Sequence, residues 1–154
     1  MGEPIEHDEA DQQYVTAIVD DQLFGIPILR AQDILAPRDI APIPLAPDYV
    51  AGMMNLRGRI VTAIDLRRRL NFEPADRTNS PSIVINHGGE QYGVLVDEIG
   101  EIREVPADCL EANPPTLDRS WGRLSRGICR LDGAPMVILN VDQVLDHRQE
   151  AGPA

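Results

Sequence analysis

The sequence predicts a mainly β protein made of small, related modules. The segment 52–58 reads Gly-Met-Met-Asn-Leu-Arg-Gly, and the segment 127–133 repeats it as Gly-Ile-Cys-Arg-Leu-Asp-Gly. A second repeat relates Phe-Gly-Ile at 24–26 to Tyr-Gly-Val at 92–94. Short β-branched or apolar runs are also separated by turn residues at close intervals, which is typical of small barrels or sandwiches. Closed barrels are favoured because closure removes the exposed edges of a sheet.

In the first half we expect strands at residues 14–19, 23–28, 53–56 and 60–64. Residues 30–35 fit either one helical turn or an irregular strand. After a proline-rich connector, residues 47–51 could begin a short helix, because proline and aspartate favour helix starts. The hairpin that contains the repeated segment turns at Arg57 and Gly58.

In the second half we expect strands at residues 83–85, 92–96 and 98–105 and a hairpin over 127–139. The glycine pair at 88–89 marks a turn that needs positive φ, and the Asp-Gly pair at 132–133 marks another. The prolines of residues 113–122 indicate a loop. The apolar spacing over 141–145 predicts a terminal helix.

Length and composition limit the class of protein. A chain of 154 residues with 43% hydrophobic residues can form one domain or two small lobes that share a core. Its apolar runs are far shorter than the roughly 20 residues that cross a bilayer. We expect an acidic disordered tail over 1–13, a folded unit of two lobes over 14–147 and a flexible tail over 148–154. No signal-peptide pattern is seen, which predicts a cytoplasmic protein.

The charge and the residue inventory exclude several functions. The formal net charge of -11 disfavours nucleic acid, whose phosphates are bound by Lys and Arg. The one basic run, at 67–69, is interpreted as a solvated helical turn. The chain has no lysine, so it lacks the amine that a Walker A loop or a Schiff-base enzyme requires.

Metal chemistry is also not expected. Cys109 and Cys129 lack the CxxC spacing of a zinc site, and the three histidines are far apart in the sequence. We expect Cys129 to be a small buried side chain rather than a nucleophile. The sequence therefore predicts no metal, no cofactor and no catalytic residue.

Several motifs together resemble the CheW family of chemotaxis coupling proteins. They are Phe-Gly-Ile at 24–26, Ala-Gln-Asp-Ile at 31–34, Pro-Asp-Tyr-Val-Ala-Gly at 47–52, Asn-Leu-Arg-Gly at 55–58, Ile-Asp-Leu-Arg at 64–67 and the segment 127–145. The match runs in order over about residues 14–146. The resemblance implies two five-stranded Src-homology-3-like β-barrels and a short C-terminal helix.

The resemblance implies an adaptor without catalysis. Such an adaptor couples the cytoplasmic tip of a methyl-accepting chemoreceptor to the regulatory domain of a CheA-type histidine kinase and controls kinase activity. It would be cytoplasmic and recruited to membrane-associated receptor arrays, without inserting into the membrane. One alternative is a CheW-like coupling module of a non-flagellar system, for surface motility or second-messenger control. Another is a small enzyme or ligand-binding barrel, although no acid, base and nucleophile converge at interpretable spacing.

Motif matching implies four receptor-binding residues. Arg57 and Asp33 supply the charges, and Ala31 and Ile102 lie at apolar positions of the same surface. The planar guanidinium of Arg57 can bind a carboxylate or backbone carbonyls. From the residues alone, Arg57 could instead be a solvated turn residue, and Asp33 could bond its own backbone. The kinase-binding residues remain unknown, because no short motif maps them.

Four glycines of the repeat are expected to serve the backbone rather than a partner: Gly52, Gly58, Gly127 and Gly133. The sequence also departs from the expected pattern. Ala31 stands where the family usually has a larger aliphatic residue, and Asp33 where glutamate is common. Asn140 stands where the first copy of the repeat has Asp65.

Overall fold

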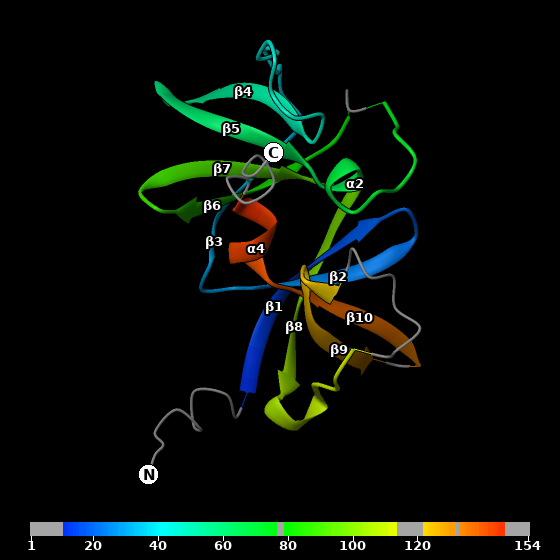
Figure 1. Cartoon of the computed structure of the whole chain (residues 1–154). Coiled ribbons are helices and arrows are strands. Elements are labelled where there is room, and N and C mark those ends of the chain that lie inside the picture. Colours follow the sequence, from blue (N-terminus) through cyan, green and yellow to red (C-terminus); the bar gives the residue numbers. More distant parts are fainter. Residues whose placement is uncertain (1–10, 77–78, 114–121, 132, 147–154) are drawn as a thin grey trace.

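The computed structural model describes residues 11–76, 79–113, 122–131 and 133–146. Its strands are β1 (Asp11–Val19), β2 (Gln22–Pro27), β3 (Ala31–Leu35), β4 (Val50–Leu56), β5 (Arg59–Asp65), β6 (Ser82–His87), β7 (Glu90–Leu95), β8 (Glu98–Pro106), β9 (Ser125–Leu131) and β10 (Ala134–Leu139). The helical segments are α2 (Leu66–Arg69), the 3-10 helix η1 (Ala107–Cys109) and α4 (Val141–Leu145). The predicted mainly β fold is confirmed, and the predicted terminal helix is α4 (Figure 1).

The boundaries of the folded part differ slightly from the prediction. Strand β1 begins at Asp11, so residues 11–13 belong to a strand rather than to the expected tail. The rest of that tail, the C-terminal tail, Asp132 and most of the loop at 113–122 lie outside the described residues. In the described part of the chain, no helix is long and apolar enough to cross a membrane.

The strands form two five-stranded sheets (Figure 1). The sheet that we call the terminal sheet has the order β8-β1-β2-β10-β9, and the one that we call the central sheet has the order β3-β6-β7-β5-β4. Strands related by the repeat take matching places, since β4 and β9 are both edges and β2 and β7 are both in the middle. Each sheet nevertheless combines two strands from one half of the chain with three from the other. The β1–β2 hairpin of the first half thus lies in the terminal sheet, and the β6–β7 hairpin of the second half lies in the central sheet. The parallel pairs β2–β10 and β7–β5 join each of these hairpins to the rest of its sheet.

One bridge joins the two edges of each sheet. In the central sheet, the segment after β3 pairs with β4 through Ala41 and Met53, which exchange two hydrogen bonds of 2.8 Å. In the terminal sheet, the segment after β8 pairs with β9 through Glu111 and Ile128, with hydrogen bonds of 2.8 and 2.9 Å. In each sheet, a segment beyond one edge strand thus reaches the other edge strand, which protects the backbone groups of that edge at the bridge.

A glycine allows the close approach at each bridge. Gly52 and Gly127 have φ values of 146° and 145°, which side chains rarely adopt. A Cβ atom at Gly52 would lie 2.2 Å from the carbonyl oxygen of Ala41, and one at Gly127 would lie 2.5 Å from that of Glu111. The repeated glycine therefore marks the position where a segment beyond one edge strand reaches the other edge strand.

The prediction that a short helix begins within residues 47–51 is wrong. This segment is a turn, in which the amide of Val50 donates to the carbonyl of Pro47 at 2.9 Å, and β4 begins at Val50. Tyr49 is buried, and its carbonyl accepts the amide of Asp65 at 2.7 Å. Pairing with a residue 16 positions away is a tertiary contact, and it overrides the local preference for a helix start.

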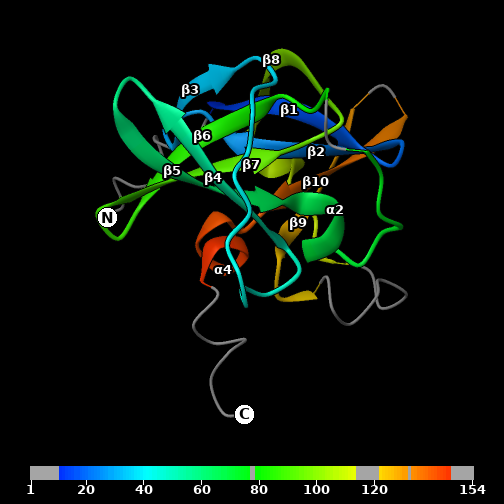
Figure 2. The same ribbon diagram turned by 90° about the horizontal axis from the view of Figure 1, so that it is seen from above.

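The basic run at 67–69 is helical, as predicted, but it is not solvated throughout. Asp65 caps α2 by accepting two backbone amides of its first turn. Arg69 is only 7% exposed and donates hydrogen bonds of 2.9 Å to the carbonyls of Gln143 and Val144 in α4. Figure 2 shows α2 and α4 on the same side of the sheets. The run therefore links the two helices, and its interpretation as a solvated turn is corrected.

Three apolar clusters hold the fold. The largest, which we call the intersheet core, combines residues of both sheets and of α4, such as Phe24, Val94 and Leu145. A second lies in the central sheet around Met54, and a third in the terminal sheet around Met136. The two sheets therefore share a core as parts of one folded unit.

Candidate functional site

The turn between β4 and β5 presents Arg57 to solvent. Arg57 has a φ of 53° and Gly58 a φ of 83°, as the tight turns of β-hairpins require. The side-chain oxygen of Asn55 accepts the amide of Gly58 at 3.0 Å and so holds the turn from within. The side chain of Arg57 is 75% exposed. Local backbone geometry thus fixes the position of this guanidinium while its donors stay accessible.

The structure brings Arg57 and Asp33 together. The Nη2 atom of Arg57 lies 3.4 Å from Oδ2 of Asp33. The Oδ1 atom of Asp33 also accepts the amide of Ile34 at 2.9 Å, so the local backbone bond that the sequence left open is present as well. Asp33 lies on β3 and Arg57 follows β4, the two edges of the central sheet. Only the curl of that sheet places them side by side.

This ion pair contributes little to stability. Asp33 is one-third exposed and Arg57 is more exposed still, so water and salt screen their attraction. Exposed pairs of this kind stabilise a fold by roughly 0–1 kcal/mol. The pair therefore adds little to the stability of the fold, and both charges stay accessible to solvent.

The two apolar candidates lie on different sheets, Ala31 on the central sheet and Ile102 on the terminal sheet. Ala31 on β3 is half-buried and packs against that core. Ile102 on β8 is 52% exposed and lies opposite Val15, a member of the core. Opposite residues of an antiparallel pair share a face, so Ile102 extends the core toward solvent. Ile34 was not singled out in the sequence, yet it is 49% exposed and lies opposite a core residue in the same way.

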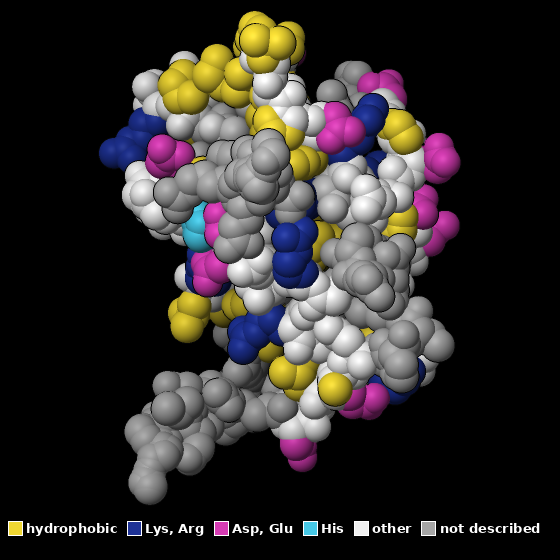
Figure 3. Space-filling model, viewed as in Figure 1, with side chains coloured by type: hydrophobic (Ala, Val, Ile, Leu, Met, Phe, Trp, Pro, Cys, Tyr) yellow, Lys and Arg dark blue, Asp and Glu magenta, His cyan; other side chains and the backbone are white. Residues whose placement is uncertain are grey.

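Further apolar side chains are exposed on the connector between β3 and β4 and on the β4–β5 hairpin. Leu45 is fully exposed and has a φ of 64°, and Ile60 is 59% exposed. Hydrophobic side chains project at the top of the view in Figure 3, over this part of the central sheet. Met53 is 37% exposed whereas Met54 is buried, as strand alternation predicts.

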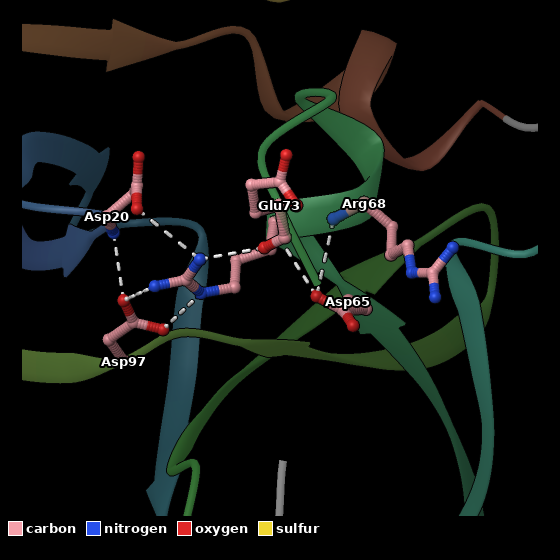
Figure 4. A network of polar contacts seen from close by, with 6 residues as sticks. Asp20, Asp65, Arg68, Glu73 and Asp97 are labelled. Carbon is pink, nitrogen blue, oxygen red and sulfur yellow. Dashed lines mark hydrogen bonds and ion pairs between the residues drawn. The ribbon is translucent and has the colours of Figure 1, made fainter. Parts of the chain in front are cut away.

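A second polar cluster joins the two sheets (Figure 4). Arg67 of α2 donates from Nε and Nη2 to the two carboxylate oxygens of Asp97, at 3.0 and 2.8 Å. Its Nη1 atom donates to the carbonyl of Glu73 at 2.8 Å and lies 3.4 Å from Oδ1 of Asp20. Asp97 lies where the chain passes from β7 to β8, and Asp20 lies in the β1–β2 turn. Arg67 therefore ties an element of the central sheet to a turn of the terminal sheet.

The charges of this cluster are mutually supported. Partial burial alone would raise the pKa of Asp97, but the hydrogen bond from Arg67, the backbone N–H of Asp20 and the charge of Arg67 outweigh it and lower that pKa. The hydrogen bond to Asp97 is the main reason why the pKa of Arg67 is raised. Sequence reasoning missed this contact, although the Asp-Leu-Arg segment of the first repeat marked its position.

Among the described residues, no group of three or more His, Cys, Asp or Glu side chains could hold a metal ion. Cys129 is buried in the terminal sheet, as the sequence predicts.

Comparison with known proteins supports the architecture and the family. The chain is 24% identical to the chemotaxis protein CheW of Treponema pallidum, over 95% of this chain and 89% of that protein. It is 28% identical to the chemotaxis protein CheW of Helicobacter pylori, over 94% and 87%. The crystal structure of the scaffolding protein TtCheW from Thermoanaerobacter tengcongensis matches with a TM-score of 0.79 and 25% identity, over 88% of this chain and 92% of that one. A family model described as a CheW-like domain matches residues 13–149, and the chain therefore belongs to the CheW family.

Proposed function

We propose that this chain is a chemotaxis scaffold that couples the cytoplasmic tips of methyl-accepting chemoreceptors to a CheA-type histidine kinase. The observation that carries the proposal is that the CheW-like domain spans residues 13–149, with the fold of a scaffolding protein. A scaffold acts by holding partners in register, so this function requires neither catalysis nor a cofactor. The protein would work in the cytoplasm, at receptor arrays on the membrane.

We propose that the receptor contacts Arg57, Asp33, Ala31 and Ile102. An amphipathic helix is bound through apolar anchors, while a few charges fix its register. Ala31 packs against the intersheet core, and Ile102 supplies exposed apolar surface opposite the core residue Val15. Arg57 and Asp33 supply opposite charges that are accessible and already paired. Because Arg57 has spare donors, it can bind a receptor carboxylate or carbonyl without leaving Asp33.

Charge reversal at Arg57 tests this surface. We expect Arg57→Glu to weaken binding of a receptor-tip fragment about tenfold, which corresponds to roughly 1.4 kcal/mol. Kinase binding and the denaturation midpoint should stay unchanged. Arg126→Glu is the matched control, since Arg126 is also an exposed arginine but lies on β9 of the other sheet. Equal receptor affinity of Arg57→Glu and the native protein would remove Arg57 from the site.

A double variant that swaps the two charges, Arg57→Asp with Asp33→Arg, distinguishes direct contact with the receptor from a purely structural role of the ion pair. This double variant keeps the attraction between the two positions but reverses the charge at each one. If the charges contact the receptor directly, binding stays weak. If they act only by holding β3 against the β4–β5 turn, binding recovers, and the direct contact is contradicted.

The coupling function is tested by reconstitution. Purified protein, receptor-containing membranes and CheA are combined, and kinase autophosphorylation is followed with and without attractant. We expect receptor control of the kinase to require this protein. Failure with every cognate receptor, while kinase and receptors work with another CheW, would contradict the proposed function.

A further inference from the structure

The two cysteines belong to the same region at the edge of the terminal sheet. Cys129 lies on β9, is 1% exposed and belongs to the apolar cluster of this sheet. Cys109 ends η1, is half-buried and packs against the same cluster. Its Sγ atom lies 4.0 Å from the carbonyl oxygen of Arg130, the residue after Cys129. Although 20 positions separate them in the sequence, the two thiols share one small region of the fold.

The backbone holds this arrangement in place. Glu111 and Ile128 form the bridge that joins the edges of the terminal sheet, two residues after Cys109 and one before Cys129. Its two hydrogen bonds, of 2.8 and 2.9 Å, fix the segment that carries Cys109 against β9. The side chains of Glu111 and Arg130 lie 3.5 Å apart and add a charge contact across the same junction.

The thiol of Cys109 also affects the pKa of Cys129. Burial is the main reason why the pKa of Cys129 is raised to about 12, and the neighbouring thiol of Cys109 raises it further. Cys129 is therefore a neutral thiol at physiological pH. Cys109 is the thiol that solvent reaches, since it is only half-buried.

We propose that Cys109 and Cys129 form an oxidation-sensitive dithiol, which closes to an intramolecular disulfide when the protein meets hydrogen peroxide. The sulfur of Cys109 attacks one peroxide oxygen, the O–O bond breaks, and a sulfenic acid and one water form. The thiol of Cys129 takes no part in the reaction with peroxide, and in the second step it gives up its proton as its sulfur attacks the sulfur of Cys109. The S–S bond forms, the S–O bond breaks, and the hydroxyl leaves with the thiol proton as a second water. Two thiols lose two electrons in total, and the peroxide gains them.

The disulfide would have a defined structural effect. It would add a covalent link where a single backbone bridge now joins the edges of the terminal sheet. A link that closes a loop restricts the unfolded chain and raises resistance to denaturation. In the central sheet, the repeat places Met54 at the position that corresponds to Cys129, so the cysteine pair is specific to the terminal sheet. In a reducing cytoplasm such a disulfide forms transiently.

The test uses the full-length, reduced protein and hydrogen peroxide. We expect the number of free thiols per chain to fall from two to zero and the intact mass to fall by two hydrogen atoms. Digestion without reductant should yield one peptide pair that links Cys109 to Cys129, and dithiothreitol should reverse the change. The oxidised protein should also have a higher denaturation midpoint than the reduced protein.

Single variants distinguish the two sulfurs. In Cys129→Ala, which avoids a buried hydroxyl, Cys109 should gain one oxygen and react with dimedone, a reagent for sulfenic acids. In Cys109→Ser, the thiol of Cys129 should remain unmodified under the same treatment. Two free thiols after treatment of the native protein, or a disulfide only between chains, would overturn the proposal. This inference does not depend on the proposed scaffold function, because its readouts involve no partner.

Discussion

The central and terminal sheets share one backbone plan but carry different chemistry at matching positions. Both curl until a segment beyond one edge strand meets the other edge strand beside a repeated glycine. Near the central bridge, the hairpin turn places an exposed arginine against Asp33. Near the terminal bridge, two thiols lie together. The same backbone contact is therefore surrounded by different side chains, which are the proposed receptor-binding charges in the central sheet and the proposed oxidation-sensitive thiols in the terminal sheet.

The helices that follow the repeated hairpins show the same principle. Asp65 caps α2 by accepting the amides of Arg67 and Arg68, and Asn140 caps α4 by accepting the amide of Gln143. An amide oxygen caps a helix about as well as a carboxylate does, so the change from aspartate to asparagine keeps the local structure. The two helices differ in the residues beyond their caps. Helix α2 carries Arg69, which donates to carbonyls of α4, whereas α4 contains no arginine.

The largest expected effect comes from breaking the bridges. We expect Gly52→Ala and Gly127→Ala each to destabilise the protein by about 3 kcal/mol or more, because the new Cβ would collide with a backbone carbonyl and the φ is unfavourable. Gly58→Ala and Gly133→Ala are the controls, since their φ values are 83° and 84° and nothing lies within 4 Å of the added atom. These should cost about 1 kcal/mol.

Urea denaturation of the four glycine variants measures these differences. Equal losses at the bridge and turn positions would show that the bridges do not require glycine. A large loss in one sheet alone would show that the two sheets do not share the plan.

A smaller effect is expected from separating the two helices. Arg69→Met removes two hydrogen bonds to α4 and the stacking of the guanidinium 4.7 Å above the ring of Tyr49, and should cost about 2 kcal/mol. Arg68→Met removes an exposed pair with Asp48 and should change stability by less than about 0.5 kcal/mol. The free energy of unfolding at neutral pH distinguishes them. If both variants lose the same free energy of unfolding, the contact of Arg69 with α4 does not stabilise the fold.

The smallest effect concerns the contact between Arg67 and Asp97. The pKa of Asp97 is lowered from 3.8 in the folded protein, so the contact stabilises the fold above that pH and the contribution is lost as the pH falls below it. We expect Asp97→Asn to cost about 1 kcal/mol at pH 7, since the pair is partly exposed. At pH 3 the variant and the native protein should differ less.

Urea denaturation at the two pH values measures the contribution of Asp97. Asp48→Asn is the control, because Asp48 belongs to an exposed pair within one part of the molecule. A constant difference between Asp97→Asn and the native protein at both pH values would assign the effect to packing rather than charge.

The sequence by itself determined the hairpins, their turns and the terminal helix. These features depend on neighbouring residues, such as the glycines at 88–89, whose φ values are 63° and 83°. The family motifs also predicted Arg57 and Asp33 as charges of one surface, and the structure places them 3.4 Å apart. Local signals of this kind are readable because the backbone conformation of a turn is set within a few residues.

Only the tertiary structure decided how the repeats combine. The exchange of hairpins between the sheets, the turn before Val50 in place of an expected helix start, and the burial of Arg69 all depend on pairings between distant segments. The meeting of Cys109 and Cys129 arises in the same way, from a bridge between two edges of one sheet. The free energy of such contacts comes from shared burial and long-range hydrogen bonds, which no local pattern of residues encodes.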